Sequence, residues 1–425
     1  MPKRKEGVVP RLRFPEFCNA GPWKVKKIGQ ISENVTAGGT PSTSVTEYWG
    51  GDIRWMNSGE LNYKKVYEVQ GRITENGLRN SNTKIIPKKC ILIGLAGQGK
   101  TRGTVAMNMV ELCINQSIAA IFPNEDVFNS DFLYHNLDNR YDELRSLSAG
   151  GEGRGGLNLQ IIKSLLVPLP CLSEQQKIAD CLSSLDEVIE LQAKKLDAFK
   201  THKKGLMQQL FPREGETTPR LRFPEFRDAG PWEVKRLSNT LHRISNGLTI
   251  AQVSGSCGVK VTRIETISTG RIDPNKVGYV NTDQDITQYR LRIGDILFSH
   301  INSLTHIGKS AYVDKDYNLY HGMNLLRLSV DAESNDSKFV FYLINTSIFQ
   351  SSVRARANQA INQASINQTE LEQSCVLIPT KKEQQKIADC LSSLDEVIEL
   401  EAQKLDVLKT HKKGLMQQLF PQEVD

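Results

Sequence analysis

Apolar residues recur at alternating steps of four and three along one stretch of the chain, residues 174–212. The positions in this pattern are Ile178, Leu182, Leu185, Ile189, Leu196, Phe199, Leu206 and Leu210, with Gln192 and Lys203 as polar interruptions. This is the a and d spacing of a helix that buries one narrow seam. At about 1.5 Å per residue, a helix of roughly 38 residues is about 57 Å long. It therefore needs a packing partner of similar length.

The same chain supplies a packing partner of equal length, because residues 383–421 repeat this stretch with four substitutions. The differing pairs are Gln192/Glu401, Lys194/Gln403, Ala198/Val407 and Phe199/Leu408. The seam of the second copy is predicted at Ile387, Leu391, Leu394, Ile398, Leu405 and Leu415. Two long helices with the same seam are thus predicted to pack on each other.

Charge indicates the direction in which the two helices pack. In the first copy, residues 174–191 carry five acidic side chains against Lys177, and residues 192–210 carry five lysines against Asp197. The second copy keeps this polarity. Antiparallel packing places each acidic half beside a basic half, whereas parallel packing would place like charges together. We therefore predict one intramolecular antiparallel coiled coil; two independent helices, each packed on its own domain, remain the alternative.

A second repeat shows that the whole chain is duplicated. Residues 10–23, PRLRFPEFCNAGPW, return at 219–232 as PRLRFPEFRDAGPW, and both repeats have an offset of 209 residues. The chain is thus two tandem units, each with a leader, a divergent globular segment and a long helix. The predicted parts are a first globular domain at 1–171, a spacer helix at 172–212, a second globular domain at 213–380, and a second spacer helix with a short tail at 381–425.

The divergent segments have the pattern of mixed α+β domains. Apolar runs at 91–93, 118–122 and 325–328 lie between polar, Gly-rich clusters and predict strands. Residues 131–147 and 337–353 are predicted to form matching helices. The fold class is therefore α+β, with two pseudo-repeated mixed α/β domains separated by a long antiparallel two-helix coiled coil.

Composition excludes several classes of protein. The net charge of +6 permits nucleic acid as a partner without proving it. The eight cysteines lack ligand-like spacing, so neither zinc nor a disulfide framework is indicated, and buried reduced thiols are expected. No signal peptide or membrane span is visible, which predicts a cytoplasmic protein without membrane contact. No metalloprotease, serine hydrolase or methyltransferase motif is present, so no catalytic residue and no metal ligand is predicted.

One motif could bind a nucleotide. GLAGQGKT at residues 94–101 satisfies the phosphate-loop pattern GxxxxGK followed by Ser or Thr, and it follows an apolar strand. A working phosphate loop must open a helix, but Gly103 and β-branched residues follow it, and the second unit lacks the pattern. A P-loop NTPase is therefore the less favoured alternative. Gln98, Lys100 and Arg102 on a Gly-rich turn are better suited to offer donors to DNA phosphates and base edges.

Other polar loops supply further candidates for DNA contact. They are the Gly-rich turn 36–44, the loop 148–158, its counterpart 354–368 and the polar segment 299–309. Arg, Asn and Gln read G and A bidentately in the major groove. The full set of candidates is Thr40, Ser42, Arg54, Gln98, Lys100, Arg102, Arg154, Asn158, Arg263, Ser299, His300, Asn302, Lys309, Arg354, Arg356 and Asn362. Solvated loops without a ligand are the alternative, and Tyr48, Trp49 and Trp55 are predicted to be core residues rather than base-stacking groups.

With these repeats, the chain resembles the specificity subunits of type I restriction-modification enzymes. The resemblance is carried by the proline-then-EQ entry to each helix (PLPCLSEQQKIA and LIPTKKEQQKIA), the KGLMQQLF helix ends, GGTPST at 38–43 and GDILFSHINS at 294–303. It implies a non-catalytic subunit with two target-recognition domains, each reading one half of a bipartite asymmetric site in double-stranded DNA.

The resemblance also implies the partners. They are two methyltransferase subunits and, for cleavage, two ATP-dependent restriction and motor subunits. S-adenosylmethionine, ATP and Mg²⁺ would belong to those partners, and this chain would hold no cofactor. A coiled-coil adaptor that joins two protein ligands remains a second class of function, and it would show no salt-dependent DNA binding.

Overall fold

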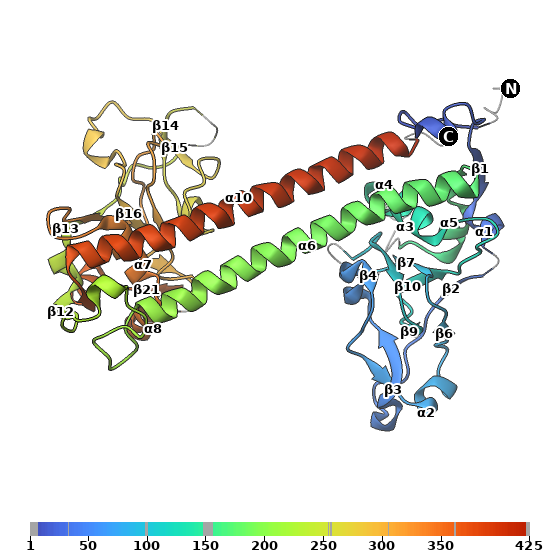
Figure 1. Ribbon diagram of the computed structural model, residues 1–425, viewed down its shortest axis with the longest axis horizontal. Coiled ribbons are helices and arrows are strands. Elements are labelled where there is room, and N and C mark those ends of the chain that lie inside the picture. The colour runs from blue at the N-terminus through green and yellow to red at the C-terminus, as the bar shows by residue number, and fades with distance from the viewer. Residues whose placement is uncertain are drawn as a thin grey trace. The chain divides into compact units, whose positions relative to one another are not determined.

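The computed structural model describes residues 7–32, 34–97, 101–147, 156–253, 255, 257–304, 306–360 and 363–421 (Figure 1). The chain forms two compact units: unit 1 contains Met1–Ala193 and Gln403–Asp425, and unit 2 contains Lys194–Ala402. Both boundaries fall inside the long helices, α6 at Leu172–Leu210 and α10 at Lys381–Leu419. Each unit therefore combines one globular domain with one part of each long helix.

Both long helices are continuous over 39 residues, as the apolar repeat predicts. Within unit 2, Lys195 Nζ of α6 pairs with Glu401 Oε1 of α10 at 2.9 Å, and Lys203 Nζ pairs with Asp395 Oδ1 at 2.6 Å. The residue number rises along α6 while it falls along α10. The helices are therefore antiparallel, which confirms the direction predicted from charge.

The predicted seam faces inward along both helices. Its buried members are Ile178, Leu182, Leu196, Ile387, Leu391, Ile398 and Leu405, and its half-buried members are Leu185, Ile189, Leu206, Leu394 and Leu415. The first turns of each helix also belong to a globular core, with Ile178 and Leu182 in that of unit 1 and Ile387 and Leu391 in that of unit 2. Each helix thus packs on its own domain as well as on the other helix, so the alternative of two independent helices is wrong.

The globular part of unit 1 is built on a five-stranded sheet in the order β2-β10-β7-β8-β4. Its strands are β2 Val35–Ala37, β10 Ile118–Ile121, β7 Ile91–Gly94, β8 Val105–Asn108 and β4 Lys65–Val66. The helices α3 Ser130–Asp138 and α5 Leu159–Ser164 lie between this sheet and α6 (Figure 1), and α4 Tyr141–Ser146 follows α3. Every residue of β7, β8 and β10 is buried, which explains why these strands are apolar throughout, except for Asn108 at the end of β8, rather than alternating.

A second sheet of unit 1 has the order β5-β3-β9-β6 and lies with α2 away from the helices (Figure 1). Its elements are β5 Arg72–Ile73, β3 Trp49–Met56, β9 Leu112–Ile114, β6 Ile85–Ile86 and α2 Glu75–Arg79. A short pair, β1 Lys24–Lys27 with β11 Leu166–Leu169, precedes α1 Ile28–Ile31 and leads into α6. This pair returns in unit 2 as β12 Glu233–Arg236 with β22 Cys375–Ile378.

Unit 2 repeats the central sheet with different sequences. The order β13-β19-β16-β18 matches β2-β10-β7-β8, and every neighbouring pair among these eight strands is antiparallel. Unit 1 adds β4, which pairs in parallel with β8. The strands are β13 Leu241–Asn246, β19 Leu326–Val330, β16 Ile296–Phe298 and β18 Ser310–Tyr312. The other elements are β14 Val259–Val261, β15 Gly278–Val280, β17 Ile301–Asn302, β20 Asn358–Ala360, β21 Gln363–Ser365, α7 Ser337–Ile344, α8 Ser347–Arg356 and α9 Gln368–Glu372. The duplication read from the leaders and long helices therefore extends to the topology of the divergent segments.

Two predicted helices are each broken in the structure. Residues 131–147 contain α3 and α4 with a break at Asn139, and residues 337–353 contain α7 and most of α8 with a break at Asn345. In unit 2 the break is a new helix start, because the Thr346 hydroxyl caps α8 by accepting a hydrogen bond from Phe349 N. The strands predicted at 91–93, 118–122 and 325–328 are present as β7, β10 and β19 with ends shifted by one or two residues.

The expectation of buried thiols is correct for only part of the cysteines. All eight are free, and Cys90 and Cys113 are buried, but Cys18, Cys171, Cys257 and Cys375 are exposed. Burial raises the pKa of Cys90 to about 12, so this thiol stays protonated. Among the helices of the described ranges, none has the length and apolarity needed to cross a membrane.

Candidate nucleic-acid interface

The Gly-rich loops of unit 1 leave its central sheet at one edge. Strand register places Ala37 of β2 and Ile93 of β7 on either side of Ala119 in β10, so β2 and β7 end where β10 begins. Gly38 N donates to Ile118 O at 3.3 Å, and Leu95 N donates to Ser117 O at 2.8 Å. The loop after β2, the turn before β10 and the loop from β7 to β8 therefore meet there. We call this the recognition edge of unit 1.

Tryptophan side chains hold the first of these loops. Trp55 Nε1 donates to Gly39 O at 3.0 Å, and Trp49 Nε1 donates to Ser42 O at 3.1 Å. The two rings pack edge to face with centroids 5.0 Å apart, and both are half-buried. Tyr48 is half-buried too, and all three aromatic residues lie outside the hydrophobic core clusters, so the prediction that they are core residues is wrong. A Cβ on Gly38 would lie 1.8 Å from Ile114 O, so this close approach requires glycine.

Thr40 meets a residue that the sequence analysis missed. Its hydroxyl hydrogen-bonds the side-chain oxygen of Gln116, which stands in the turn before β10. The two residues are 76 positions apart, so only the strand register brings them together. Ser42 is exposed and shares a hydrogen bond of 2.8 Å with Ser44. The recognition edge therefore presents hydroxyl and amide groups from two separate segments.

The segment 94–101 is not a phosphate loop of the NTPase kind. β7 ends at Gly94, and the chain returns as β8, which pairs antiparallel with β7. Gly103 N donates to Gly94 O at 2.9 Å, so a β connection stands where a phosphate loop needs a helix start. Arg102 lies half-buried in this connection at the recognition edge, whereas Gln98 and Lys100 fall outside the described residues.

The loop 148–158 is described only at its end, so Arg154 also lies outside the described residues. A Cβ on Gly156 would lie 3.4 Å from Leu95 O, which places this end of the loop beside the connection from β7 to β8. Asn158 caps α5 by accepting a hydrogen bond from Ile161 N at 2.9 Å. Asn367 caps α9 in the same way, so this repeated Asn first serves the helix start.

Unit 2 has an equivalent recognition edge. Register places Phe298 of β16 opposite Ser310 of β18 and Leu326 of β19, so the residues after β16 leave the sheet as those after β7 do. Ser299 is fully buried and holds the position of Asn302, whose Nδ2 donates to Ser299 Oγ at 3.2 Å. Direct DNA contact by the Ser299 side chain is therefore excluded in this conformation.

The neighbouring candidates for DNA contact in unit 2 differ in their burial and in the hydrogen bonds that they make within the protein. His300 is half-buried, and burial lowers the pKa of its imidazole, so the ring is neutral at pH 7. Lys309 Nζ donates to Ser268 O at 2.9 Å, which ties this lysine to the neighbouring loop. Asn302 belongs to a three-stranded ribbon, β17-β21-β20, where register aligns it with Ala364 and Gln359. Gln359 is exposed and was missed as an individual candidate, although the segment 354–368 that contains it was singled out.

Most of the remaining arginine candidates make ion pairs or hydrogen bonds within the protein. Arg54 lies in β3 and pairs with Glu68 at 3.3 Å, and this hydrogen bonding lowers the pKa of Glu68 to about 2. Arg263 pairs with Glu265 at 3.7 Å. Arg356 Nη1 donates to Ser374 Oγ at 3.3 Å. Arg354 is half-buried on α8, and Asn362 lies outside the described residues.

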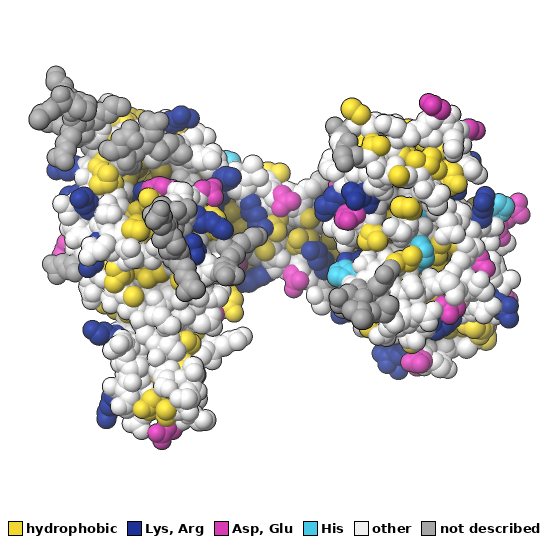
Figure 2. Space-filling view, turned by 180° about the vertical axis from the view of Figure 1, so that it is seen from behind, with side chains coloured by type: hydrophobic (Ala, Val, Ile, Leu, Met, Phe, Trp, Pro, Cys, Tyr) yellow, Lys and Arg dark blue, Asp and Glu magenta, His cyan; other side chains and the backbone are white. Residues whose placement is uncertain are grey.

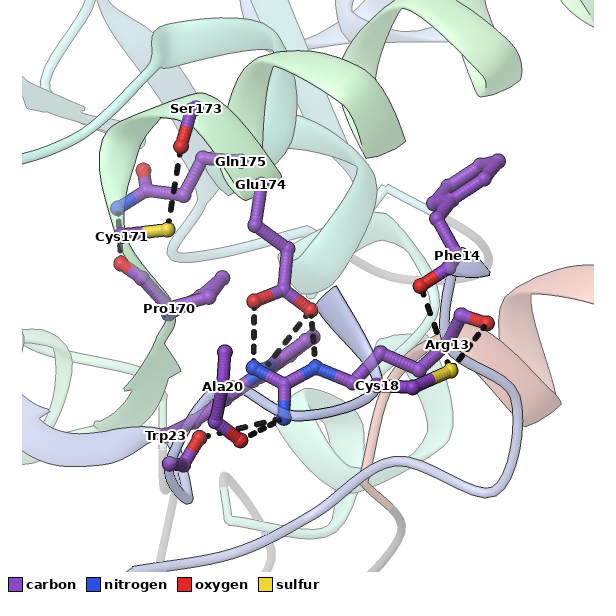
Figure 3. Close-up of polar contacts among 11 residues, drawn as sticks. Arg13, Phe14, Cys18, Ala20, Trp23, Pro170, Cys171, Ser173, Glu174 and Gln175 are labelled. Atoms are coloured by element: carbon purple, nitrogen blue, oxygen red, sulfur yellow. Dashed lines mark hydrogen bonds and ion pairs between the residues drawn. The ribbon is translucent and has the colours of Figure 1, made fainter. Parts of the chain in front are cut away.

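A buried ion pair joins each leader to the start of its long helix, and Figure 3 shows the pair of unit 1. Arg13 donates through Nε and Nη2 to the two oxygens of Glu174, both at 2.7 Å, and Trp23 Nε1 donates to Glu174 Oε1 at 3.2 Å. The same contacts recur in unit 2 among Arg222, Trp232 and Glu383, at 2.7, 2.7 and 3.3 Å. Hydrogen bonding to the carboxylate raises the pKa of both guanidinium groups, so the pairs stay charged.

On the face drawn in Figure 2, Lys and Arg side chains stand in several separate groups with apolar side chains between them. Acidic side chains lie near several of these groups. Among the described residues, no group of three or more His, Cys, Asp or Glu side chains could hold a metal ion.

Comparison with known proteins adds independent information. The family model for the type I restriction modification DNA specificity domain matches residues 21–201 and again 230–410. The type I restriction enzyme MjaVIII specificity subunit of Methanocaldococcus jannaschii is 24% identical over 424 residues, covering 96% of this chain and 93% of that protein. A protein of the same organism named for the MjaX restriction enzyme is 44% identical over 196 residues, but that match spans only 45% of this chain and 46% of the relative.

A solved structure shares the fold. The crystal structure of the type I restriction-modification system S subunit from M. genitalium superposes with a TM-score of 0.61 over 98% of this chain and 100% of that one. Sequence identity in this superposition is 15%. The two family matches are offset by 209 residues, as are the leader and helix repeats.

Proposed function

Because the chain belongs to the family of type I restriction-modification DNA specificity proteins, we propose that each of its two recognition domains reads one half of a bipartite, asymmetric DNA site. The chain is the DNA-recognition component of such a system and not its catalytic component.

One observation carries the proposal: two sheets of the same topology present different chemistry at the same edge. The edge of unit 1 offers Thr40, Gln116 and Arg102, whereas that of unit 2 offers Asn302 and Gln359. Arginine is suited to guanine, and Asn or Gln is suited to adenine, when they contact base edges in the major groove. Two sheets with the same strand order but different side chains at the edge favour recognition of two different half-sites.

The chain should work in an assembly. The family supports docking with methyltransferase subunits and with restriction and motor subunits, two of each in the proposed complex. S-adenosylmethionine, ATP and Mg²⁺ would then be bound by those subunits. The long helices are suited to docking because both are continuous and carry exposed apolar residues, Leu191 and Leu400, at equivalent positions.

Mapping of methylated adenines tests the proposal. Genomic DNA is sequenced from cells that carry this chain with its methyltransferase partner, and from matched cells that lack only this chain. The expected result is one methylated motif made of two different half-sites separated by unread base pairs, present only with the chain. A continuous motif, or methylation that persists without the chain, would contradict the proposed reading.

A further inference from the structure

A basic hollow lies in unit 2 beside the end of α6. It has a volume of about 650 Å³ and is lined by the last turns of α6, the residues that follow it, and the turn from α7 into α8. Figure 1 shows α8 next to this end of α6. The cations that line it are Lys200, Lys203, Lys204, Arg213 and Arg354, and the only acidic residue in its lining is Glu214. We call it the α6–α8 hollow.

Most of these cations have no carboxylate partner. Lys203 is neutralised by Asp395 at 2.6 Å and lies over the Tyr342 ring, with its Nζ 5.0 Å from the centroid. Within the described part of the chain, Lys200, Lys204, Arg213 and Arg354 make no ion pair. These four cations outnumber the one acidic residue of the lining, Glu214, and like charges placed together repel one another, which costs stability unless an anion binds between them. The α6–α8 hollow is therefore suited to an anionic ligand.

The floor of the hollow is rigid and apolar. Phe211 is buried, with its ring stacked on Phe339 at 5.4 Å and edge-on to Trp232 at 6.0 Å. Lys200 and Lys204 are exposed and stand one helical turn apart on α6. The cations thus project from well-packed elements, so binding of a ligand costs little conformational entropy of the backbone that carries them.

The hollow adjoins the recognition edge of unit 2. Gln350 Nε2 of α8 donates to Gly308 O at 2.9 Å, and Asn345 Nδ2 donates to Ser310 Oγ at 2.7 Å. Gly308 ends the loop that leads from the ribbon strand β17 back to β18, and Ser310 begins β18. If a DNA duplex binds at this edge, its sugar-phosphate backbone would therefore lie close to the α6–α8 hollow. The two amides named here are already bonded, so they are not available to read a base.

We propose that the α6–α8 hollow binds phosphate groups of the DNA backbone beside the second half-site, through Lys200, Lys204 and Arg354. The inference rests on the proposed function and deepens it, because it assigns to the repeated helix a part in holding DNA. Contacts to phosphates carry no sequence information, but they fix the register in which base-reading side chains meet the groove. The α6–α8 hollow would thus position the duplex for Asn302 and Gln359.

The salt dependence of DNA binding tests this assignment. The full chain is assembled with its methyltransferase subunits, and its affinity for a duplex carrying the methylated motif is titrated between about 50 mM and 200 mM salt. Each phosphate contact contributes about 0.9 to the slope of log K against log salt. The double variant Lys200→Gln/Lys204→Gln should reduce the slope by about 1.8, and Arg354→Gln should reduce it by about 0.9. The ratio of affinities for the motif and for a scrambled duplex should stay the same.

The matched control is Lys382→Gln, which removes an exposed cation from the first turn of α10 in the same unit. Its slope should equal that of the unmodified chain. An unchanged slope in the double variant, or an equal reduction in the control, would overturn the proposal. Loss of methyltransferase binding with an unchanged slope would also overturn it, because the hollow would then be a protein-docking site. Failure of the unmodified chain to prefer the motif would instead count against the proposed function.

Discussion

Replacing Arg13 with alanine removes the charge partner of a carboxylate that is shielded from water. The side chains of Arg13 and Glu174 are 8% and 1% exposed. After the change, Glu174 loses two hydrogen bonds of 2.7 Å and keeps the bond from Trp23 at 3.2 Å. Removing one member of a buried ion pair costs about 3 to 5 kcal/mol. Because Trp23 still donates, we expect about 3 kcal/mol, the lower end of that range.

The loss should be local to the start of α6, so hydrogen exchange is the assay that resolves it. The free energy of opening is measured for peptides that cover residues 172–182 and, as the internal reference, residues 381–391. Arg13→Ala should speed exchange in the first peptide and leave the second unchanged. Arg222→Ala breaks the equivalent pair with Glu383 and should give the reverse result.

Two outcomes would refute this reasoning. A loss below about 1 kcal/mol, the range of exposed ion pairs, would show that the carboxylate is solvated. Equal changes in both peptides would show that the contact does not act locally. Arg13→Lys provides a graded control, because it keeps the charge but cannot make the bidentate contact, and it should fall between alanine and the unmodified chain.

Two further predictions concern unit 2. Asn302→Ala and Gln359→Ala should each weaken binding to the methylated motif by about 1 to 3 kcal/mol if they contact bases, and relax the sequence of one half-site only; an affinity that stays the same for every duplex would exclude them from recognition. His321 is fully buried, and its Nε2 hydrogen-bonds Leu325 O at 3.0 Å. Burial lowers the pKa of the His321 imidazole to about 4. The unfolded chain takes up this proton near pH 6.5, so unit 2 should lose about 3 kcal/mol as the pH falls from there to about 4. Urea unfolding should show this loss, and His321→Gln should reduce it; an equal loss in the variant would contradict the assignment to His321.

Repeats and charge made the architecture predictable from sequence. The apolar seam predicts two helices of equal length, and the opposite charge of their halves predicts their direction. A pair in unit 1 follows the same rule, with Lys412 Nζ 2.5 Å from Asp186 Oδ1. These features are local or repeated with few substitutions, so a single sequence displays them.

The parts that could not be predicted depend on contacts between distant residues. Arg13 and Glu174 are 161 positions apart, and neither the leader nor the helix alone indicates their pairing. Gln116 reaches Thr40 only through the register of β2 and β10. The repeated Asn158 resembled a DNA contact by residue type, but its side chain caps α5. Residue type and loop position therefore selected candidate loops, whereas the contacts that each side chain makes required the folded chain.

The central claim is that each unit reads its own half-site, and an exchange of one domain tests it most directly. Residues 10–170 are replaced by the corresponding segment of a relative whose methylated motif is known, with both long helices kept. Methylated adenines are then mapped genome-wide in cells carrying the hybrid and its methyltransferase partner. The account predicts a motif in which one half is that of the relative and the other half is unchanged. A change in both halves, or in neither, would contradict it.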